Sequence, residues 1–82
     1  EGAYAQTKRA LEIIRDALAQ AGADLTDVVR TRLFMANMGD FDAVAKAHGE
    51  VFGDIRPATT IVEVSKLVDA AFVVEVEALA VI

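Results

Sequence analysis

The sequence predicts one small α/β domain of the α+β type, in which two helices pack on one face of a β-sheet. Apolar residues recur every three or four positions in segments 3–21 and 41–52, as they do in amphipathic helices. Segments 28–35, 58–64 and 72–82 are rich in β-branched residues and alternate in polarity, as strands do. The order is therefore helix, strand, helix, strand, strand.

The first helix is expected over residues 3–21, and its apolar face consists of Tyr4, Thr7, Leu11, Ile14 and Leu18. Gly22 is expected to end this helix, because a left-handed backbone costs least at glycine. Residues 24–27 then form a turn.

The first strand, residues 28–35, is expected to alternate between two faces. One face carries Val29, Thr31, Leu33 and Met35, and the other carries Val28, Arg30, Arg32 and Phe34. The two arginines are expected to share a mixed sheet face with Glu63, Glu75 and Glu77, because charges on a covered face need partners of opposite sign.

The second helix is expected to begin after Asp40, a good N-cap, and to end at Gly53. Its apolar stripe consists of Phe41, Val44, His48, Val51 and Phe52, with Ala45 on the flank. The stripe would pack this helix against the sheet.

The last two strands are predicted to form a hairpin, joined by a polar turn at residues 65–69. Alternation in the final strand separates Val74, Val76, Ala78 and Ala80 from Glu75, Glu77 and Leu79. The sheet would then have one apolar face and one mixed face with three carboxylates. Because the final strand ends in uncharged apolar residues, more strands are expected beside it, from further sequence or from other subunits.

Composition excludes several classes of function. The chain has 82 residues and is 55% hydrophobic, which indicates further surface buried in an oligomer. A net charge of −5 argues against nucleic-acid binding, which depends on Lys and Arg. Without cysteine there is no disulfide and no thiolate metal site. No membrane-spanning segment or signal peptide is visible, so a cytoplasmic oligomer without metal or cofactor is expected.

No sequence motif identifies a catalytic centre on its own, since phosphate loops, nucleophile elbows and two-histidine metal spacings are absent. His48, the only histidine, is expected to pack as a core residue, with a role as base or ligand as the alternative. Glu75 and Glu77 point the same way and suit either acid–base chemistry or interface ion pairs. Three further residues suit either ligand binding or ordinary strand and loop positions, namely Arg56, Thr59 and Thr60.

Several short segments recur in the order typical of one known family. They include Gln6-Thr7, Ala21-Gly22-Ala23-Asp24-Leu25, Met38-Gly39-Asp40-Phe41, Val51-Phe52-Gly53, Pro57-Ala58 and Val74-Glu75-Val76-Glu77-Ala78. Together they make the chain resemble the YjgF/Rid family of reactive-intermediate deaminases, also labelled L-PSP endoribonuclease-like. The resemblance runs over the whole length of the chain.

The resemblance implies a chorismate-mutase-like domain that assembles as a homotrimer and binds small ligands in clefts between subunits. It also implies that residues 1–82 are the C-terminal two-thirds of one domain, with N-terminal strands that this sequence lacks. Active members of the family hydrolyse enamines and imines and release ammonia. Their site has a glutamate that positions water, matched by Glu75, and an arginine that binds the substrate carboxylate, where this chain has Thr59.

We therefore expect a subunit of a homotrimer that binds a small metabolite in a cleft between subunits. If it is an enzyme, the expected reaction is hydrolytic deamination of an imine that lacks a carboxylate, with Glu75 positioning the water. Arg56, Thr59 and Thr60 would contact the substrate. The first alternative is a ligand-sensing or protein-interaction trimer without catalysis. The second, RNA cleavage, follows only from the family's label, and the acidic charge argues against it.

Overall fold

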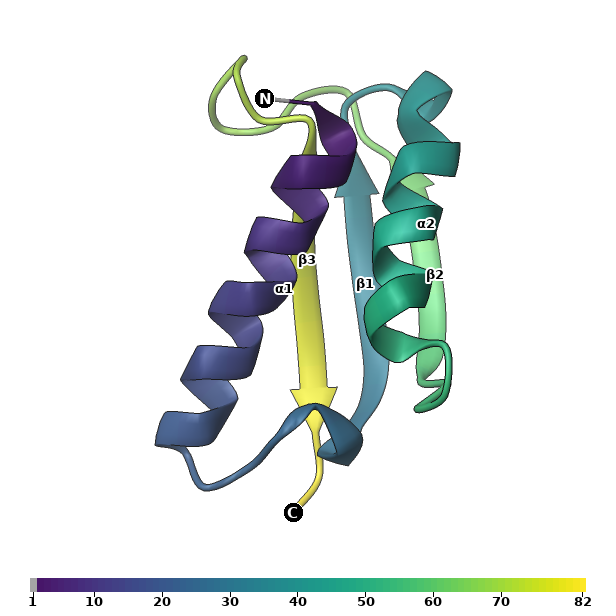
Figure 1. Ribbon diagram of the computed structural model, residues 1–82. Helices are drawn as coiled ribbons and strands as arrows, with labels where there is room; N and C mark the ends of the chain where they lie inside the picture. Colours follow the sequence, from purple (N-terminus) through teal and green to yellow (C-terminus); the bar gives the residue numbers. More distant parts are fainter. Residues whose placement is uncertain (1) are drawn as a thin grey trace.

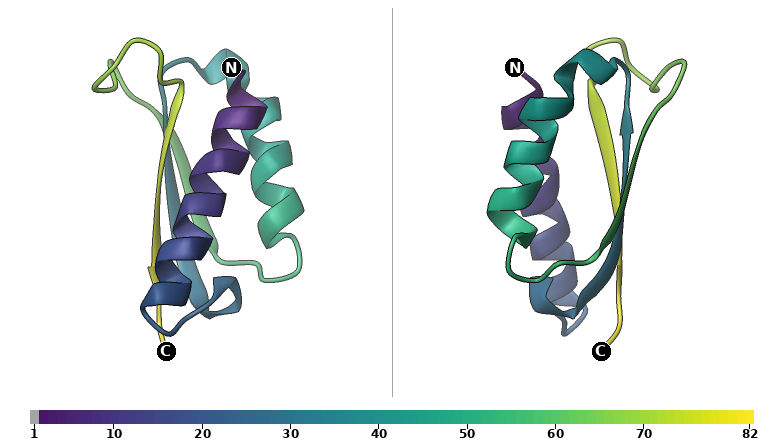
Figure 2. Two further views of the ribbon diagram at one scale, coloured as in Figure 1. Left: turned by 60° about the vertical axis from the view of Figure 1, so that its left-hand side comes forward. Right: turned by 90° about the vertical axis from the view of Figure 1, so that its right-hand side faces the viewer.

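Two helices cover one face of a three-stranded sheet (Figure 1). The computed structural model describes residues 2–82. In chain order the elements are α1 (Ala3–Gln20), β1 (Val28–Met35), α2 (Phe41–Phe52), β2 (Ala58–Glu63) and β3 (Val74–Ala80). Short 3₁₀ turns at Leu25–Asp27 and Met38–Asp40 precede β1 and α2. The predicted fold class is confirmed, because both helices lie on the same side of the sheet (Figure 2).

The strand order in the sheet is β2-β1-β3, so β1 is the central strand. It pairs in parallel with β2 and antiparallel with β3. The predicted hairpin is therefore wrong, because the last two strands lie on opposite edges of β1. The crossover through α2 brings β2 alongside β1, and the connection over residues 64–73 then passes the end of β1 to reach its free edge (Figure 1).

The core lies between the helices and the sheet. One buried cluster consists of Ala3, Leu33, Met35, Val44 and Val74, and a second consists of Leu11, Val28 and Phe52. Both clusters combine residues from helices and strands, so neither layer buries its apolar side chains without the other. Within residues 2–82, no helix combines the length and hydropathy that crossing a bilayer requires.

The beginning of β1 departs from the predicted alternation. The pairing register with β3 shifts between Val28 and Arg30, as it does at a β-bulge. As a result Val28 is buried at 3% exposure and Val29 is 46% exposed, which reverses the predicted faces of these two residues. From Thr31 to Met35 the alternation is as predicted.

The residues predicted to begin and end the helices lie at the helix ends, but not all of them act there as predicted. Asp40 is the N-cap residue of α2, but its side chain makes no capping hydrogen bond. Asn37 caps the preceding 3₁₀ turn instead, because its Oδ1 accepts the Gly39 N–H at 2.8 Å. On the predicted apolar stripe, Phe41 is 42% exposed, and the unpredicted Ala47 is fully buried.

The two helix ends differ in backbone conformation. Gly22 follows α1 with φ +84°, the left-handed conformation predicted for it. Gly53 ends α2 with a helical φ of −56°, and the left-handed residue of that connection is Arg56, at φ 60°. The chain therefore turns into β2 at Arg56.

A glutamine of α1 fastens the connection that leads into β3. The Gln6 Nε2 donates to the Ala71 carbonyl oxygen, and the Gln6 Oε1 accepts the Val73 N–H, each at 2.9 Å. The side-chain amide thus bonds this segment as a neighbouring strand would. It fixes the residue at which β3 begins, and therefore which of Val74 and Glu75 points toward the helices and which points away from them.

We expect Gln6→Ala to lower the free energy of unfolding by about 1–2 kcal/mol, because two hydrogen bonds to the backbone are lost, a part-buried one to Val73 and an exposed one to Ala71. Gln20→Ala is the matched control, since Gln20 is exposed at the other end of the same helix. Urea denaturation of both variants measures the difference. Equal stability of the two would contradict the role assigned to Gln6.

Candidate functional site

The sequence-predicted site residues lie on two different surfaces of the subunit. Thr59 turns toward the helices, where its Oγ1 lies 2.9 Å from the Oγ1 of the buried Thr31. Thr60 therefore points to the other sheet face, which is also the face of the exposed Glu75. Arg56 is exposed in the connection before β2. Within one subunit, Glu75 and Thr59 lie on opposite faces and on strands separated by β1.

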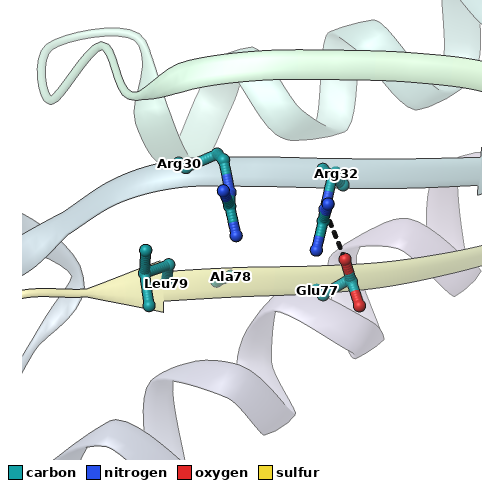
Figure 3. Close-up of a pocket in the computed structure, with 5 residues that line it drawn as sticks. All are labelled: Arg30, Arg32, Glu77, Ala78 and Leu79. Carbon is teal, nitrogen blue, oxygen red and sulfur yellow. Dashed lines mark ion pairs between the residues drawn. The ribbon is translucent and has the colours of Figure 1, made fainter.

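We call the sheet face without helices the open face (Figure 2). It has a shallow hollow of about 110 Å³ between β1 and the end of β3, lined by Arg30, Arg32, Glu77, Ala78 and Leu79 (Figure 3). Arg32 and Glu77 are cross-strand partners, and the Arg32 Nε lies 2.5 Å from the Glu77 Oε1. On the other side of Arg32 the register places Thr60. The mixed face predicted from the sequence is thus present.

One of the three carboxylates predicted for this face lies elsewhere. Glu63 is the register partner of the buried Met35, so it belongs to the helix-covered side of the sheet. Its Oε1 accepts the Met38 N–H at 2.6 Å and holds the turn before α2. Ile61, two residues earlier, packs against the buried cluster and is likewise not on the open face. The open face therefore carries two carboxylates, and they differ in their contacts.

Glu77 is paired with Arg32, whereas Glu75 makes no hydrogen bond or ion pair to any of the described residues. Apolar side chains are exposed around both carboxylates. Among them Val62 is 39% and Leu79 is 45% exposed. A face of exposed apolar residues beside an available carboxylate suits contact with another molecule.

The helix-covered side has a hydrogen-bonded group that the sequence did not indicate. Thr31, fully buried in β1, lies with its Oγ1 2.9 Å from the His48 Nε2 and 2.9 Å from the Thr59 Oγ1. The Thr59 Oγ1 also donates to the Pro57 carbonyl oxygen at 3.1 Å. We call Thr31, His48 and Thr59 the hydroxyl–imidazole chain.

The expectation that His48 only packs is therefore incomplete. Its ring does pack on Phe52, with ring centroids 4.9 Å apart, and its burial lowers the pKa of the imidazole. Its Nε2 nevertheless has a specific polar partner. A polar Thr31 among the buried positions of β1 was the available signal, because a buried hydroxyl needs a partner.

The two surfaces have different chemistry. The open face offers a carboxylate, Glu75, and the cations Arg30 and Arg32. The second surface is the edge of the sheet formed by β2, with Thr59 and the preceding Arg56, which we call the β2 edge. It offers the hydroxyl of Thr59, which is neutral and can both donate and accept a hydrogen bond. Such an edge can bind a polar uncharged group, but it cannot replace the paired donors of an arginine for a carboxylate.

Comparison with known proteins assigns the chain to a group of relatives. The family model described as Endoribonuclease L-PSP matches residues 1–82. A 3-aminoacrylate deaminase RutC of Acinetobacter baylyi is 37% identical over 62 residues, which are 76% of this chain and 49% of that protein. A 2-iminobutanoate/2-iminopropanoate deaminase of Capra hircus is 35% identical over 80 residues, 98% of this chain and 58% of that protein.

Solved structures agree with this assignment. The crystal structure of Rv2704 from Mycobacterium tuberculosis, described as a member of the YjgF/YER057c/UK114 family, matches with a TM-score of 0.91 at 45% identity. The match covers 93% of this chain and 64% of that one. Against three other curated relatives, the chain spans 55–59% of their length.

The buried imidazole predicts how stability depends on pH. Because burial lowers the folded-state pKa of His48, the unfolded chain, with an ordinary pKa of about 6.5, binds the proton first on acidification. The free energy of unfolding should therefore fall as the pH decreases below about 6.5, until the folded-state pKa is passed. His48→Gln should remove this component, which urea denaturation at pH 5 and pH 7.5 would measure.

His48 is the only histidine, so no other imidazole contributes to the difference between the two proteins. The same pH dependence in the His48→Gln variant would show that His48 does not titrate differently in the folded state.

Proposed function

The chain belongs to the endoribonuclease L-PSP family, and on that premise we propose that it hydrolyses a small imine or enamine in a cleft between subunits of a homotrimer. The observation that carries this proposal is the free carboxylate of Glu75. Glu63 and Glu77 are engaged by Met38 and Arg32, but Glu75 has no partner among the described residues. The deaminase names of two relatives, at 35–37% identity, support the same reaction class.

The proposed chemistry needs one base and one polar contact for the substrate. The Glu75 carboxylate would accept a proton from water as the water oxygen bonds to the imine carbon. The C=N double bond becomes a single bond, and the nitrogen takes up the proton that Glu75 accepted. After a second proton reaches the nitrogen, the new hydroxyl gives its proton to Glu75 and forms the carbonyl group as the C–N bond breaks, so ammonia is released. Arg56, Thr59 and Thr60 would contact the substrate.

The proposal requires two subunits because Glu75 and Thr59 lie on opposite faces of the sheet of one subunit. A ring-closing contact joins two different surfaces of each subunit. If these surfaces are the open face and the β2 edge, Glu75 of one subunit meets Thr59 and Arg56 of the next. The exposed apolar residues of the open face would be covered by the same contact.

A trimer without catalysis is the second candidate function, and one observation favours it. Thr59 stands where active relatives are expected to carry an arginine, and its hydroxyl is occupied by Thr31 and Pro57. The ligand would then be sensed rather than hydrolysed. The assay of imine hydrolysis separates the two candidates.

Light scattering on the full-length protein should give the mass of three subunits at micromolar concentration. Arg32→Glu should weaken this assembly, because it places a third carboxylate beside Glu77 and Glu75 on the open face. Arg15→Glu, on the exposed side of α1, is the matched charge reversal and should leave the trimer intact. A stable monomer of the unmodified protein would rule out the inter-subunit site.

We expect little hydrolysis of 2-iminopropanoate or 2-iminobutanoate by the unmodified protein. A missing charge-assisted contact to the substrate carboxylate costs about 1.5–3 kcal/mol, or roughly ten- to over a hundredfold. Thr59→Arg should increase the rate of ammonia release from imines generated in situ by an amino-acid oxidase. Adding Glu75→Gln should abolish that gain, whereas adding Glu77→Gln, two residues along the same strand, should retain most of it.

Efficient turnover of either imino acid by the unmodified protein would show that another group binds the carboxylate, with Arg56 the first candidate. If Thr59→Arg gains no activity while remaining trimeric, the non-catalytic function is favoured instead.

A further inference from the structure

The hydroxyl–imidazole chain leads from the interior of the subunit to its edge. His48 is half-buried on α2, Thr31 is fully buried in the central strand, and Thr59 is exposed on the edge strand β2. Both links of the chain are 2.9 Å, the ordinary distance of a hydrogen bond. The imidazole is thereby connected to a surface position that it does not itself reach by a hydrogen bond.

We propose that His48, Thr31 and Thr59 form a proton relay, through which the His48 imidazole supplies a proton to an uncharged ligand bound at the β2 edge. Thr59 is the group that touches the ligand, and His48 acts on it through Thr31. The existence of the relay depends only on this geometry, whereas its use in releasing ammonia rests on the function proposed above.

The hydrogen bonds form a complete sequence of donors and acceptors when His48 is protonated. The Nε2–H then donates to the Thr31 Oγ1, the Thr31 hydroxyl donates to Thr59, and the Thr59 hydroxyl donates to the Pro57 carbonyl oxygen. A ligand nitrogen that replaces the Pro57 oxygen as acceptor would stand at the end of this sequence.

Proton transfer along the relay balances. Nε2 gives one proton to Thr31, Thr31 gives its own to Thr59, and Thr59 gives its own to the amine nitrogen of the hydrated imine. Each hydroxyl gains one proton and loses one, so both threonines end as they began. The hydroxyl of the hydrated imine then gives its proton to the Glu75 carboxylate as its oxygen forms the C=O double bond, and the C–N bond breaks with its electron pair on nitrogen. Ammonia leaves, and neutral His48 regains a proton from water. Because burial makes the imidazolium a stronger acid, its proton is released readily.

Charged groups do not interrupt the relay. The strands packed against His48 present the neutral hydroxyls of Thr31 and Thr59, and the charged residue on that side of β2, Glu63, is bound to the Met38 N–H. On α2 itself, Lys46 and Glu50 are directed to Tyr4 of α1, and the Lys8 of α1 pairs with Glu50 at 3.2 Å. Burial alone accounts for the lowered pKa of His48.

The relay also specifies a class of ligand. It ends in a neutral hydroxyl, so its natural partner is an imine, an enamine or an amine nitrogen without a carboxylate beside it. Among the three groups of the relay, a carboxylate at this edge would contact only the neutral hydroxyl of Thr59. The preference for an uncharged ligand adds to the proposed function a division of roles. The β2 edge would deliver the proton to the leaving nitrogen, and Glu75 would activate the water.

The test is an NMR titration of His48 in the full-length protein, which needs no ligand. In the Thr59→Val variant the Thr31 hydroxyl has no acceptor when His48 is protonated, but it can still donate to the neutral Nε2. The His48 pKa should therefore fall by about half a pH unit, and Thr31→Val should lower it by about one unit or more. Thr59→Ser, which keeps the hydroxyl, should leave it unchanged.

Thr60→Val is the matched control, because it removes a hydroxyl from the next residue of the same strand on the opposite face. An unchanged His48 pKa in Thr59→Val would overturn the relay, since no coupling would then pass through Thr31. If the His48 pKa shifts in Thr59→Val but the protein hydrolyses no imine, the relay stands and the proposed reaction is refuted. If the protein hydrolyses an imine but the His48 pKa does not shift in Thr59→Val, the proposed reaction stands and the relay is refuted.

Discussion

The double pairing of β1 is the constraint on which the rest of this structure depends. β1 is hydrogen-bonded to β2 along one edge and to β3 along the other, and its inward side chains are covered by both helices. A strand bound in this way has no freedom of register, because a slip by one residue would expose Leu33 and Met35. Three candidate functional residues, Thr59, Thr60 and Glu75, are placed by their pairing with this strand. Glu75 lies beside it on the open face, and Thr59 lies beside it under the helices.

Local patterns in the sequence were sufficient to predict the elements, but not how the strands pair. The bounds of β1 and the end of α1 just before Gly22 follow from alternation and from the backbone preference of glycine, which act over a few residues. The pairing of β2 and β3 with β1 is decided by contacts between distant segments. Two neighbouring strands in the sequence therefore resembled a hairpin, although the central strand separates them.

For the candidate site, too, the features that depend on neighbouring residues could be predicted, and those that depend on strand pairing could not. The outward direction of Glu75 and Glu77 follows from alternation within β3, and this part of the prediction is confirmed. The direction of Glu63 depends on the register of β2 against β1, which the sequence does not specify. The link from Thr59 to His48 requires three elements to meet at Thr31, and no spacing along the chain encodes such a meeting.

The amide of Gln6 has a consequence for the order in which the fold can form. Its two partners, Ala71 and Val73, lie 65 and 67 residues further along the chain. During synthesis the first helix therefore leaves the ribosome long before the segment that it fastens, and the part of its apolar face that packs on β3 stays uncovered until that strand is made. The closing of so long a loop has a high entropic cost, so the final strand should join late and the folding rate should be low for a domain of this size.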